Sequence, residues 1–200
     1  MERNETFELI IDDVVNQQYA VMDNFFTTAE VDVLKKGLLD AFETNQFKKS
    51  AIGNRADEKV MDAIRGDYIF WLDEQDTSAA AQLFFAKINE FIAYINATCY
   101  LGINEKEFHY AVYPEGTFYK RHLDVFQNDK RRRLSLVCYL NDENWLPEYG
   151  GELVIYKDSG DVVVYPEKGR VVIFDSQTLE HEVKPVQQKR YSITGWLKTR

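Results

Sequence analysis

Hydrophobic and polar residues follow two different periods along the chain, and the change falls near its middle. In the first half, apolar side chains recur at helical spacing in two segments, which predicts two amphipathic helices. The first is expected to begin after Thr27, whose spacing to Glu30 fits a capping box, and to end near Thr44. The second is expected to begin after Ser78, a residue type that caps helices.

From Glu107 onward the period is two, which is typical of strands with one buried face. Turns such as Gly150–Gly151 separate eight strand-like segments: FHYAVY, TFYKRHLDV, RLSLVCYL, ELVIY, DVVVY, RVVIF, HEVKPV and YSITGWL. Short strands at this spacing predict a mainly β fold, a double-stranded β-helix (jelly roll) barrel. We expect one domain over residues 1–200, with two N-terminal helices in about 1–100 that cover one face of a core in about 101–200. Tyr68–Leu72 is expected to add a strand.

Composition and charge disfavour several classes of protein. The chain has 200 residues, of which 45% are hydrophobic and 28% charged, as in ordinary globular proteins. Its net charge of −9 disfavours nucleic acid as a partner, because proteins that bind nucleic acid are usually basic. No apolar stretch is long enough to cross a membrane, and the first residues lack the apolar run of a signal peptide. Both cysteines, Cys99 and Cys138, are expected to be reduced, so we expect a cytoplasmic protein.

Candidate chemistry lies in two of the three histidines. His122 and Asp124 stand two positions apart, so on a strand both side chains point to the same face. His181 follows on a later predicted strand. Two histidines and one carboxylate form the facial triad of non-haem Fe(II) oxygenases, which leaves coordination positions open. On its own, the His-Leu-Asp sequence fits a surface ion pair better than a metal site.

Further residues favour a site that also holds an organic anion. Arg190 begins the predicted strand after His181, because the segment 184–189 can turn the chain. Its guanidinium can bind a carboxylate through two hydrogen bonds. Tyr113, Tyr119 and Tyr139 lie on strands of the predicted barrel, where their hydroxyl groups can also bond an anion.

These residues carry a family resemblance. YPEGTFYKRHLD, LVCYLN, GGELVIY, HEVKP with Arg190, and YSITGW resemble the 2-oxoglutarate and Fe(II)-dependent dioxygenases of the prolyl hydroxylase branch. IRGDYIFWLD, at 64–73, resembles the same stretch of the hypoxia-inducible-factor prolyl hydroxylases. The resemblance runs from about Tyr19 to Leu197 and therefore covers nearly the whole chain.

The resemblance implies a role for each matching residue. His122, Asp124 and His181 would ligate Fe(II), and Arg190 would pair with the distal carboxylate of 2-oxoglutarate. The other residues of the cosubstrate pocket would be Tyr139, Tyr113, Tyr119, Thr194 and Trp196. Arg65 and Trp71 would lie beside the substrate, and Asp67 would form an ion pair with Arg132. O₂ would be the second cosubstrate, with ascorbate as reductant.

Two features depart from the family pattern or stand apart from it. His109 replaces the family's methionine. It lies on the same face of the predicted strand as Tyr113, so it should face the pocket, either as part of a packed wall or in contact with the cosubstrate. The basic run Lys130–Arg133 fits either a solvated hairpin or a rim that docks an acidic substrate segment or fixes Asp67.

The expected reaction is hydroxylation of a prolyl residue in an intracellular protein, with consumption of O₂ and release of succinate and CO₂. The missing zinc-finger segment and the acidic chain argue against a transcription factor as substrate, and the habit of the resembled family favours a translation-machinery protein. Two alternatives stay open. One is a hydroxylase of the same superfamily that acts on a free amino acid or another small molecule. The other is a cupin-type metal-binding protein, which would not need Arg190.

Overall fold

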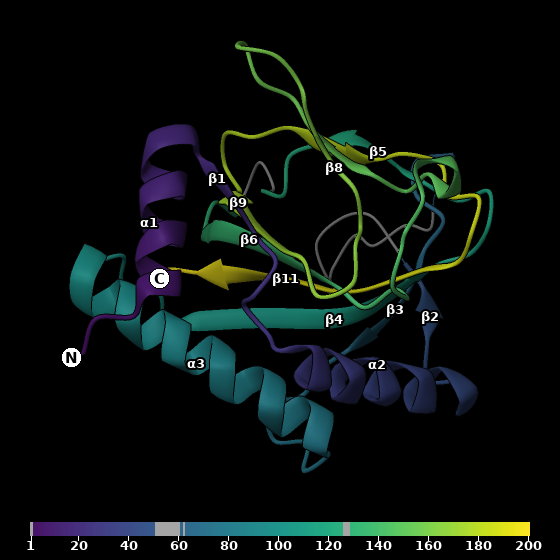
Figure 1. Cartoon of the computed structure of the whole chain (residues 1–200), viewed down its shortest axis with the longest axis horizontal. Helices are drawn as coiled ribbons and strands as arrows, with labels where there is room; N and C mark the ends of the chain where they lie inside the picture. The colour runs from purple at the N-terminus through teal and green to yellow at the C-terminus, as the bar shows by residue number, and fades with distance from the viewer. Residues whose placement is uncertain (1, 51–60, 62, 126–128) are drawn as a thin grey trace.

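A computed structural model describes residues 2–50, 61, 63–125 and 129–200 (Figure 1). Within these ranges the strands form two antiparallel sheets. The large sheet has the order β1 (Tyr19–Met22), β9 (Val171–Asp175), β6 (Arg132–Tyr139), β11 (Arg190–Lys198), β4 (Glu105–Tyr113), β3 (Tyr68–Trp71), β2 (Lys48–Lys49). The small sheet has the order β5 (Tyr119–His122), β10 (His181–Val183), β7 (Leu153–Ile155), β8 (Val162–Val164). All eight strands expected after Glu107 are therefore present, as is the strand at Tyr68.

Three helices cover one face of the large sheet: α1 (Glu5–Gln17), α2 (Thr28–Glu43) and α3 (Ala79–Cys99). The capping box of Thr27 and Glu30 is confirmed at the start of α2, and the Ser78 hydroxyl accepts from the third residue of α3. The sequence interpretation expected two helices and missed α1, which Asn4 caps. Figure 1 shows α2 and α3 on one side of β4 and β11, with β5 and β8 on the other side.

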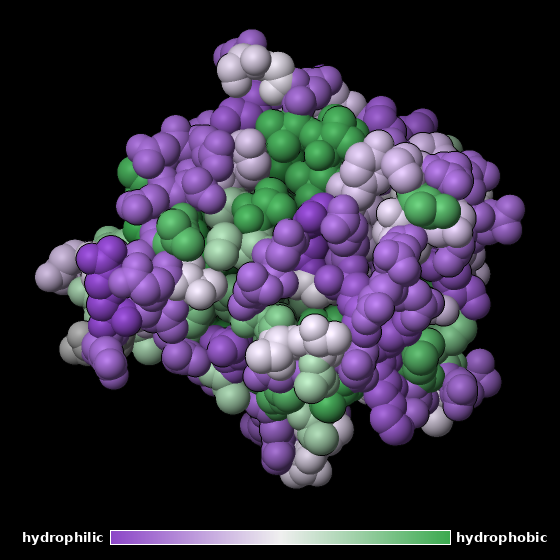
Figure 2. All heavy atoms as spheres, viewed as in Figure 1, coloured by the Kyte–Doolittle hydropathy of each residue, from purple (hydrophilic) through white to green (hydrophobic). Residues whose placement is uncertain are grey.

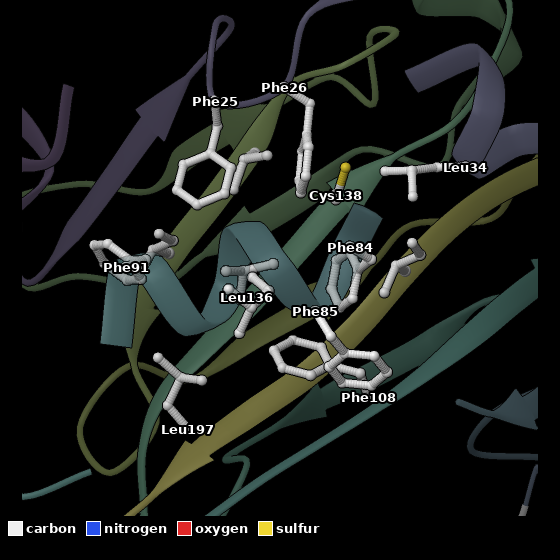
Figure 3. Packing of buried hydrophobic residues seen from close by; sticks show 14 of the residues in the cluster. Phe25, Phe26, Leu34, Phe84, Phe85, Phe91, Phe108, Leu136, Cys138 and Leu197 are labelled. Carbon is white, nitrogen blue, oxygen red and sulfur yellow. The ribbon is translucent and has the colours of Figure 1, made fainter. Parts of the chain in front are cut away.

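The helices and the large sheet enclose a core that is rich in phenylalanine. The Phe84 ring lies 5.9 Å from that of Phe26 and 4.9 Å from that of Phe108, so α3 is fixed directly against β4 (Figure 3). The helices pack closely where α2 carries Gly37, since a Cβ there would lie 2.4 Å from the Cβ of Ala80. This side of the sheet therefore supplies a large apolar burial, which is the main favourable contribution to folding.

A second apolar cluster lies between the two sheets. Alternate residues of the large-sheet strands divide between the two clusters, as the period of two predicts: on β4, Phe108 and Tyr110 face the helices, while Ala111 and Tyr113 face the small sheet. The small sheet contributes residues such as Ile155 to this inner cluster. The sheets face one another as in a jelly roll, although their strands do not close into a barrel.

The visible surface is mostly hydrophilic, with a hydrophobic group in the region of β8 (Figure 2). Val163 of this strand is 52% exposed. Among the described residues, no helix has both the length and the apolar character that crossing a membrane requires.

Candidate metal and anion-binding site

Three side chains that commonly bind metals meet at one end of the small sheet. His122 ends β5 and His181 begins β10, and the two residues lie directly opposite one another in the antiparallel register. Asp124 follows two residues after β5. One ligand atom from each residue lies within 4.8 Å of the others. The Asp124 carboxylate oxygens lie 3.5 Å from Nε2 of His122 and 3.5 Å from Nε2 of His181, so all three groups face a common point.

Backbone carbonyls fix which ring nitrogen of each histidine is available. Nδ1 of His122 lies 2.6 Å from the carbonyl oxygen of Lys120, and Nδ1 of His181 lies 3.2 Å from that of Leu179. A carbonyl only accepts hydrogen bonds, so each Nδ1 carries the proton. In the neutral form of each ring the lone pair is then on Nε2, the atom 3.5 Å from the Asp124 carboxylate, which is the arrangement that a metal ion needs.

Asp124 reaches the site by a different route from the one expected. The sequence interpretation placed it on the same strand as His122, but β5 ends at His122. Contacts from β6 hold Asp124 instead: Ser135 donates to its carboxylate at 2.6 Å, and Arg132 donates to its backbone carbonyl at 2.9 Å. The carboxylate therefore stays beside the histidines without the support of a β ladder.

The protonation states of the three groups suit a cation. Burial would raise the pKa of Asp124, but the neighbouring His181 and His122 and the hydrogen bond that Ser135 donates hold it below its usual range. Burial lowers the pKa of His181 to about 4. At neutral pH the cluster thus offers a carboxylate and an uncharged imidazole at His181, which are the forms that bind transition metals.

Arg190 is buried in the space between the two sheets. It begins β11, as the sequence predicted, and is 1% exposed. Its guanidinium lies 4.9 Å from the ring centres of both Tyr113 and Tyr139. Gly151 makes room for this side chain, because a Cβ there would lie 3.0 Å from Cδ of Arg190 and 2.6 Å from Val186.

The buried polar atoms around Arg190 suit an anionic ligand. Nε of Arg190 and the Tyr139 hydroxyl both lack a hydrogen-bond partner among the described residues. A guanidinium taken out of water without a counter-charge costs several kcal/mol, roughly, so such groups are normally paired. We conclude that this position suits a carboxylate ligand.

Other residues predicted for the pocket lie beside a metal-binding candidate or on the same face of β11 as Arg190. The Tyr119 ring stacks on His122 at 3.6 Å. Thr194, whose hydroxyl lies 3.3 Å from that of Ser192, is on the inward-facing side of β11 with Arg190 and Trp196.

His109 is a buried pocket-wall residue beside tryptophans. Its ring lies 4.9 Å from that of Trp71 and 5.6 Å from that of Trp196. Nδ1 of His109 and Nε1 of Trp196 have no hydrogen-bond partner among the described residues. The ring of His109 thus packs against its neighbours, while its Nδ1 is available for a ligand contact.

We expect His109 to make the protein less stable in acid. Burial, with the nearby Arg65 guanidinium, lowers the pKa of His109 from 6.5 to about 3. As the pH falls below 6.5, His109 becomes protonated in the unfolded chain but stays neutral in the folded protein. The free energy of unfolding therefore decreases. Between pH 7 and pH 5 the native protein should lose about 2 kcal/mol more unfolding free energy than His109→Met, which does not titrate. Urea denaturation at both pH values measures this, and equal losses would contradict it.

The structure corrects the predicted ion pair of Asp67 with Arg132. Asp67 is fully buried and pairs with Arg65 through two hydrogen bonds of 2.8 and 2.6 Å. Arg132 instead binds Glu107 at 2.7 Å and lies over the Trp196 ring at 3.4 Å. The expected pairing is wrong because Arg65, two residues away on the same segment, binds both oxygens of the carboxylate. Trp71, the other residue predicted beside the substrate, is 48% exposed.

A double-mutant cycle distinguishes the two pairings. Asp67→Ala should lower the unfolding free energy by about 3–5 kcal/mol, because it leaves the buried Arg65 guanidinium without its partner. The cycle of Asp67→Ala with Arg65→Ala should show strong coupling in the unfolding free energy. In the cycle of Asp67→Ala with Arg132→Ala, the two changes in unfolding free energy should add to within about 0.5 kcal/mol. Stronger coupling to Arg132 would restore the original prediction.

The basic run Lys130–Arg133 is engaged in contacts within the protein. Arg131 pairs with Asp129 at 2.9 Å and with Glu105 at 3.0 Å, and Arg133 donates to Gln177 at 3.1 Å. Arg132 is bound as described above. Three of the four side chains therefore hold the ends of strands together, and the run does not fix Asp67.

Comparisons with known proteins agree with this geometry. The family model of the 2OG-Fe(II) oxygenase superfamily matches residues 108–198, from β4 to β11. The crystal structure of a Pseudomonas putida prolyl-4-hydroxylase is 32% identical, with a TM-score of 0.88 over 98% of this chain and 100% of that one. The chain belongs to the 2OG-Fe(II) oxygenase superfamily, which binds Fe(II), 2-oxoglutarate and O₂.

Other similar proteins are also prolyl hydroxylases. A Trichoplax adhaerens prolyl hydroxylase, solved with a peptide of the hypoxia-inducible-factor oxygen degradation domain, is 25% identical with a TM-score of 0.85 over 96% of this chain and 89% of that one. A hypoxia-inducible factor prolyl hydroxylase of Caenorhabditis elegans is 29% identical over 89% of this chain. The chain spans 26% of the length of that nematode protein. The resemblance to prolyl hydroxylases and the jelly-roll fold are thus confirmed.

Proposed function

We propose that this protein hydroxylates a prolyl residue within a peptide segment of another protein, with 2-oxoglutarate and O₂ as cosubstrates. One observation carries the proposal: a buried arginine and the His-Asp-His cluster both contact the apolar cluster between the sheets, since Arg190 lies over Tyr113 and Tyr139 and His181 lies against Phe174. A metal-binding protein that used no keto acid would gain nothing from burying this charge. The prolyl hydroxylases among the similar structures support the choice of substrate.

In this proposal His122, Asp124 and His181 hold Fe(II) and leave coordination positions open. The residues fit the ion because two Nε2 atoms and a carboxylate converge at a buried point. Fe(II), once bound, supplies the activation of O₂ and the oxidative decarboxylation of 2-oxoglutarate to succinate and CO₂. The backbone carbonyls bind Nδ1 of each histidine and so leave Nε2 for the metal, and the protein places the cosubstrate beside the metal.

Arg190 and Tyr139 hold the far carboxylate of 2-oxoglutarate. Their Nε and hydroxyl groups are the unpartnered polar atoms of the pocket, so a carboxylate satisfies both. Tyr113, Tyr119, Thr194, Trp196 and His109 form the walls around it. The apolar residues of the inner cluster exclude water and thereby strengthen the ion pair.

The substrate segment binds beside Trp71, which is exposed at the rim, with the Arg65–Asp67 pair behind it. Leu123, between two of the proposed metal ligands, is 38% exposed and offers the segment a second apolar contact. A proline suits such a surface because its ring is apolar, its φ is preset and it has no N–H group to satisfy. An extended segment can dock there through main-chain hydrogen bonds.

Mass spectrometry of a cell lysate tests the proposal. The protein is incubated with the lysate, Fe(II), 2-oxoglutarate and ascorbate, which we expect to act as reductant, and added oxygen is mapped on peptides. We expect oxygen on prolines of a cytoplasmic protein, and translation-machinery proteins are our first candidates. Oxygen only on free amino acids, with succinate release, would favour the small-molecule hydroxylase, and no succinate release would favour a metal-binding protein.

A further inference from the structure

Two buried serines lie behind the carboxylate of Asp124. The Ser135 hydroxyl is 2.6 Å from Oδ2 of Asp124, and the Ser176 hydroxyl is 2.8 Å from that of Ser135. Ser135 is 1% exposed and Ser176 is fully buried. Neither serine is among the residues assigned above to the metal, the cosubstrate or the substrate. The proposed function therefore gives them no role.

The chemistry of the groups fixes the direction of this chain of hydrogen bonds. A carboxylate only accepts, so the single hydroxyl proton of Ser135 goes to Asp124. The oxygen of Ser135 must then accept from Ser176, which is the donor at the far end. The main chain holds Ser176 in turn, because its N–H donates to the carbonyl of Arg133 at 3.1 Å. The orientation of Oδ2 is thereby tied to β6.

Asp124 needs this support more than the two histidines do. His122 and His181 lie on neighbouring strands that pair with each other, so the ladder itself positions them. Asp124 follows the end of β5 and has no ladder partner. Ser135 sits in the middle of the sheet, opposite Trp196 on β11 and Phe174 on β9, and is therefore a rigid anchor.

We propose that Ser135, supported by Ser176, is a positioning residue that holds the Asp124 carboxylate in the orientation that binds the metal. This inference rests on the proposed metal site. Outer partners of metal ligands change metal affinity by about 10- to 100-fold when they are removed. Ser135→Ala is expected to fall in this range, because the carboxylate then rotates freely in the absence of metal.

Titration with Mn(II), without 2-oxoglutarate, tests the inference, with free Mn(II) followed by electron paramagnetic resonance. We expect Ser135→Ala to bind Mn(II) about 10- to 100-fold more weakly than the native protein. Ser135→Thr keeps the hydroxyl and should stay close to the native affinity. Ser176→Ala should lose less than Ser135→Ala, because Ser135 can still donate but is less well oriented.

Ser192→Ala is the matched control. Ser192 is also a buried serine on an inward-facing strand position, but its hydroxyl bonds Thr194 rather than Asp124. Its Mn(II) affinity should stay close to native, whatever its effect on the unfolding temperature. Native affinity in Ser135→Ala, or an equal loss in Ser192→Ala, would overturn the inference. Failure of the native protein to bind Mn(II) would instead overturn the proposed function itself.

Discussion

Replacing His181 with alanine is expected to abolish turnover while the chain stays folded. His181 supplies one of the three groups that meet at the proposed metal site. Removing a direct ligand should weaken metal binding by more than the roughly 10- to 100-fold that the loss of an outer partner costs. The fold should survive because both apolar clusters stay intact, and because an imidazole that is costly to protonate in the folded state is removed. His122→Ala and Asp124→Ala should behave in the same way.

Metal content, succinate release and the circular dichroism spectrum measure this prediction together. Glu182→Ala is the matched control, because Glu182 is the next residue of β10, and its side chain bonds Tyr156 outside the site. It should keep both metal and turnover. Native turnover by His181→Ala would show that the metal centre lies elsewhere.

Arg190→Ala is expected to weaken 2-oxoglutarate binding by more than about 100-fold. The cosubstrate carboxylate would then be buried without its counter-charge, which costs about 3–5 kcal/mol. Metal affinity in the absence of 2-oxoglutarate should not change, since Arg190 contacts Tyr113 and Tyr139 rather than the metal ligands. The substitution therefore separates cosubstrate binding from metal binding.

A thermal-shift titration in the presence of Mn(II) measures the effect. At a ligand concentration of 100 times its Kd, 2-oxoglutarate should stabilise the native protein by about 2.7 kcal/mol, and it should barely shift Arg190→Ala. Arg190→Lys is the control for charge alone, because lysine keeps the charge but loses the planar fork, and it should lie between the two. An unchanged shift in Arg190→Ala would mean that another group anchors the cosubstrate.

The succession of the strands along the chain was predictable from sequence because it depends on local signals, and the His-x-Asp spacing with the family resemblance pointed to the three residues that the structure brings together. The period of two marks which residues face inward, and a turn before Arg190 places it at the start of β11. The helix at Glu5–Gln17 was missed although Phe7 and Ile10, which it buries, stand at helical spacing. That signal was available in the sequence.

Contacts between distant segments were less predictable. The sequence interpretation paired Asp67 with Arg132 by register and overlooked Arg65, whose proximity depends on how the segment bends before β3. It also placed Asp124 on a strand, although hydrogen bonds from β6 hold it in the bend that follows. One clue was present: Ser135 is a polar residue at an inward-facing position of RLSLVCYL, where burial requires a hydrogen-bond partner.

The division of the large sheet between two apolar clusters has a consequence for sequence variation. Along β6 and β11, neighbouring residues are under different constraints. One side chain packs against the helices, and the next faces the small sheet and the proposed site. A map of tolerated substitutions should therefore alternate from one position to the next. Changes at positions such as Leu136 and Ile193 should shift the unfolding temperature, whereas changes at Ser135 and Arg190 should shift ligand affinity. Stability and chemistry can thus be altered separately on the same strands.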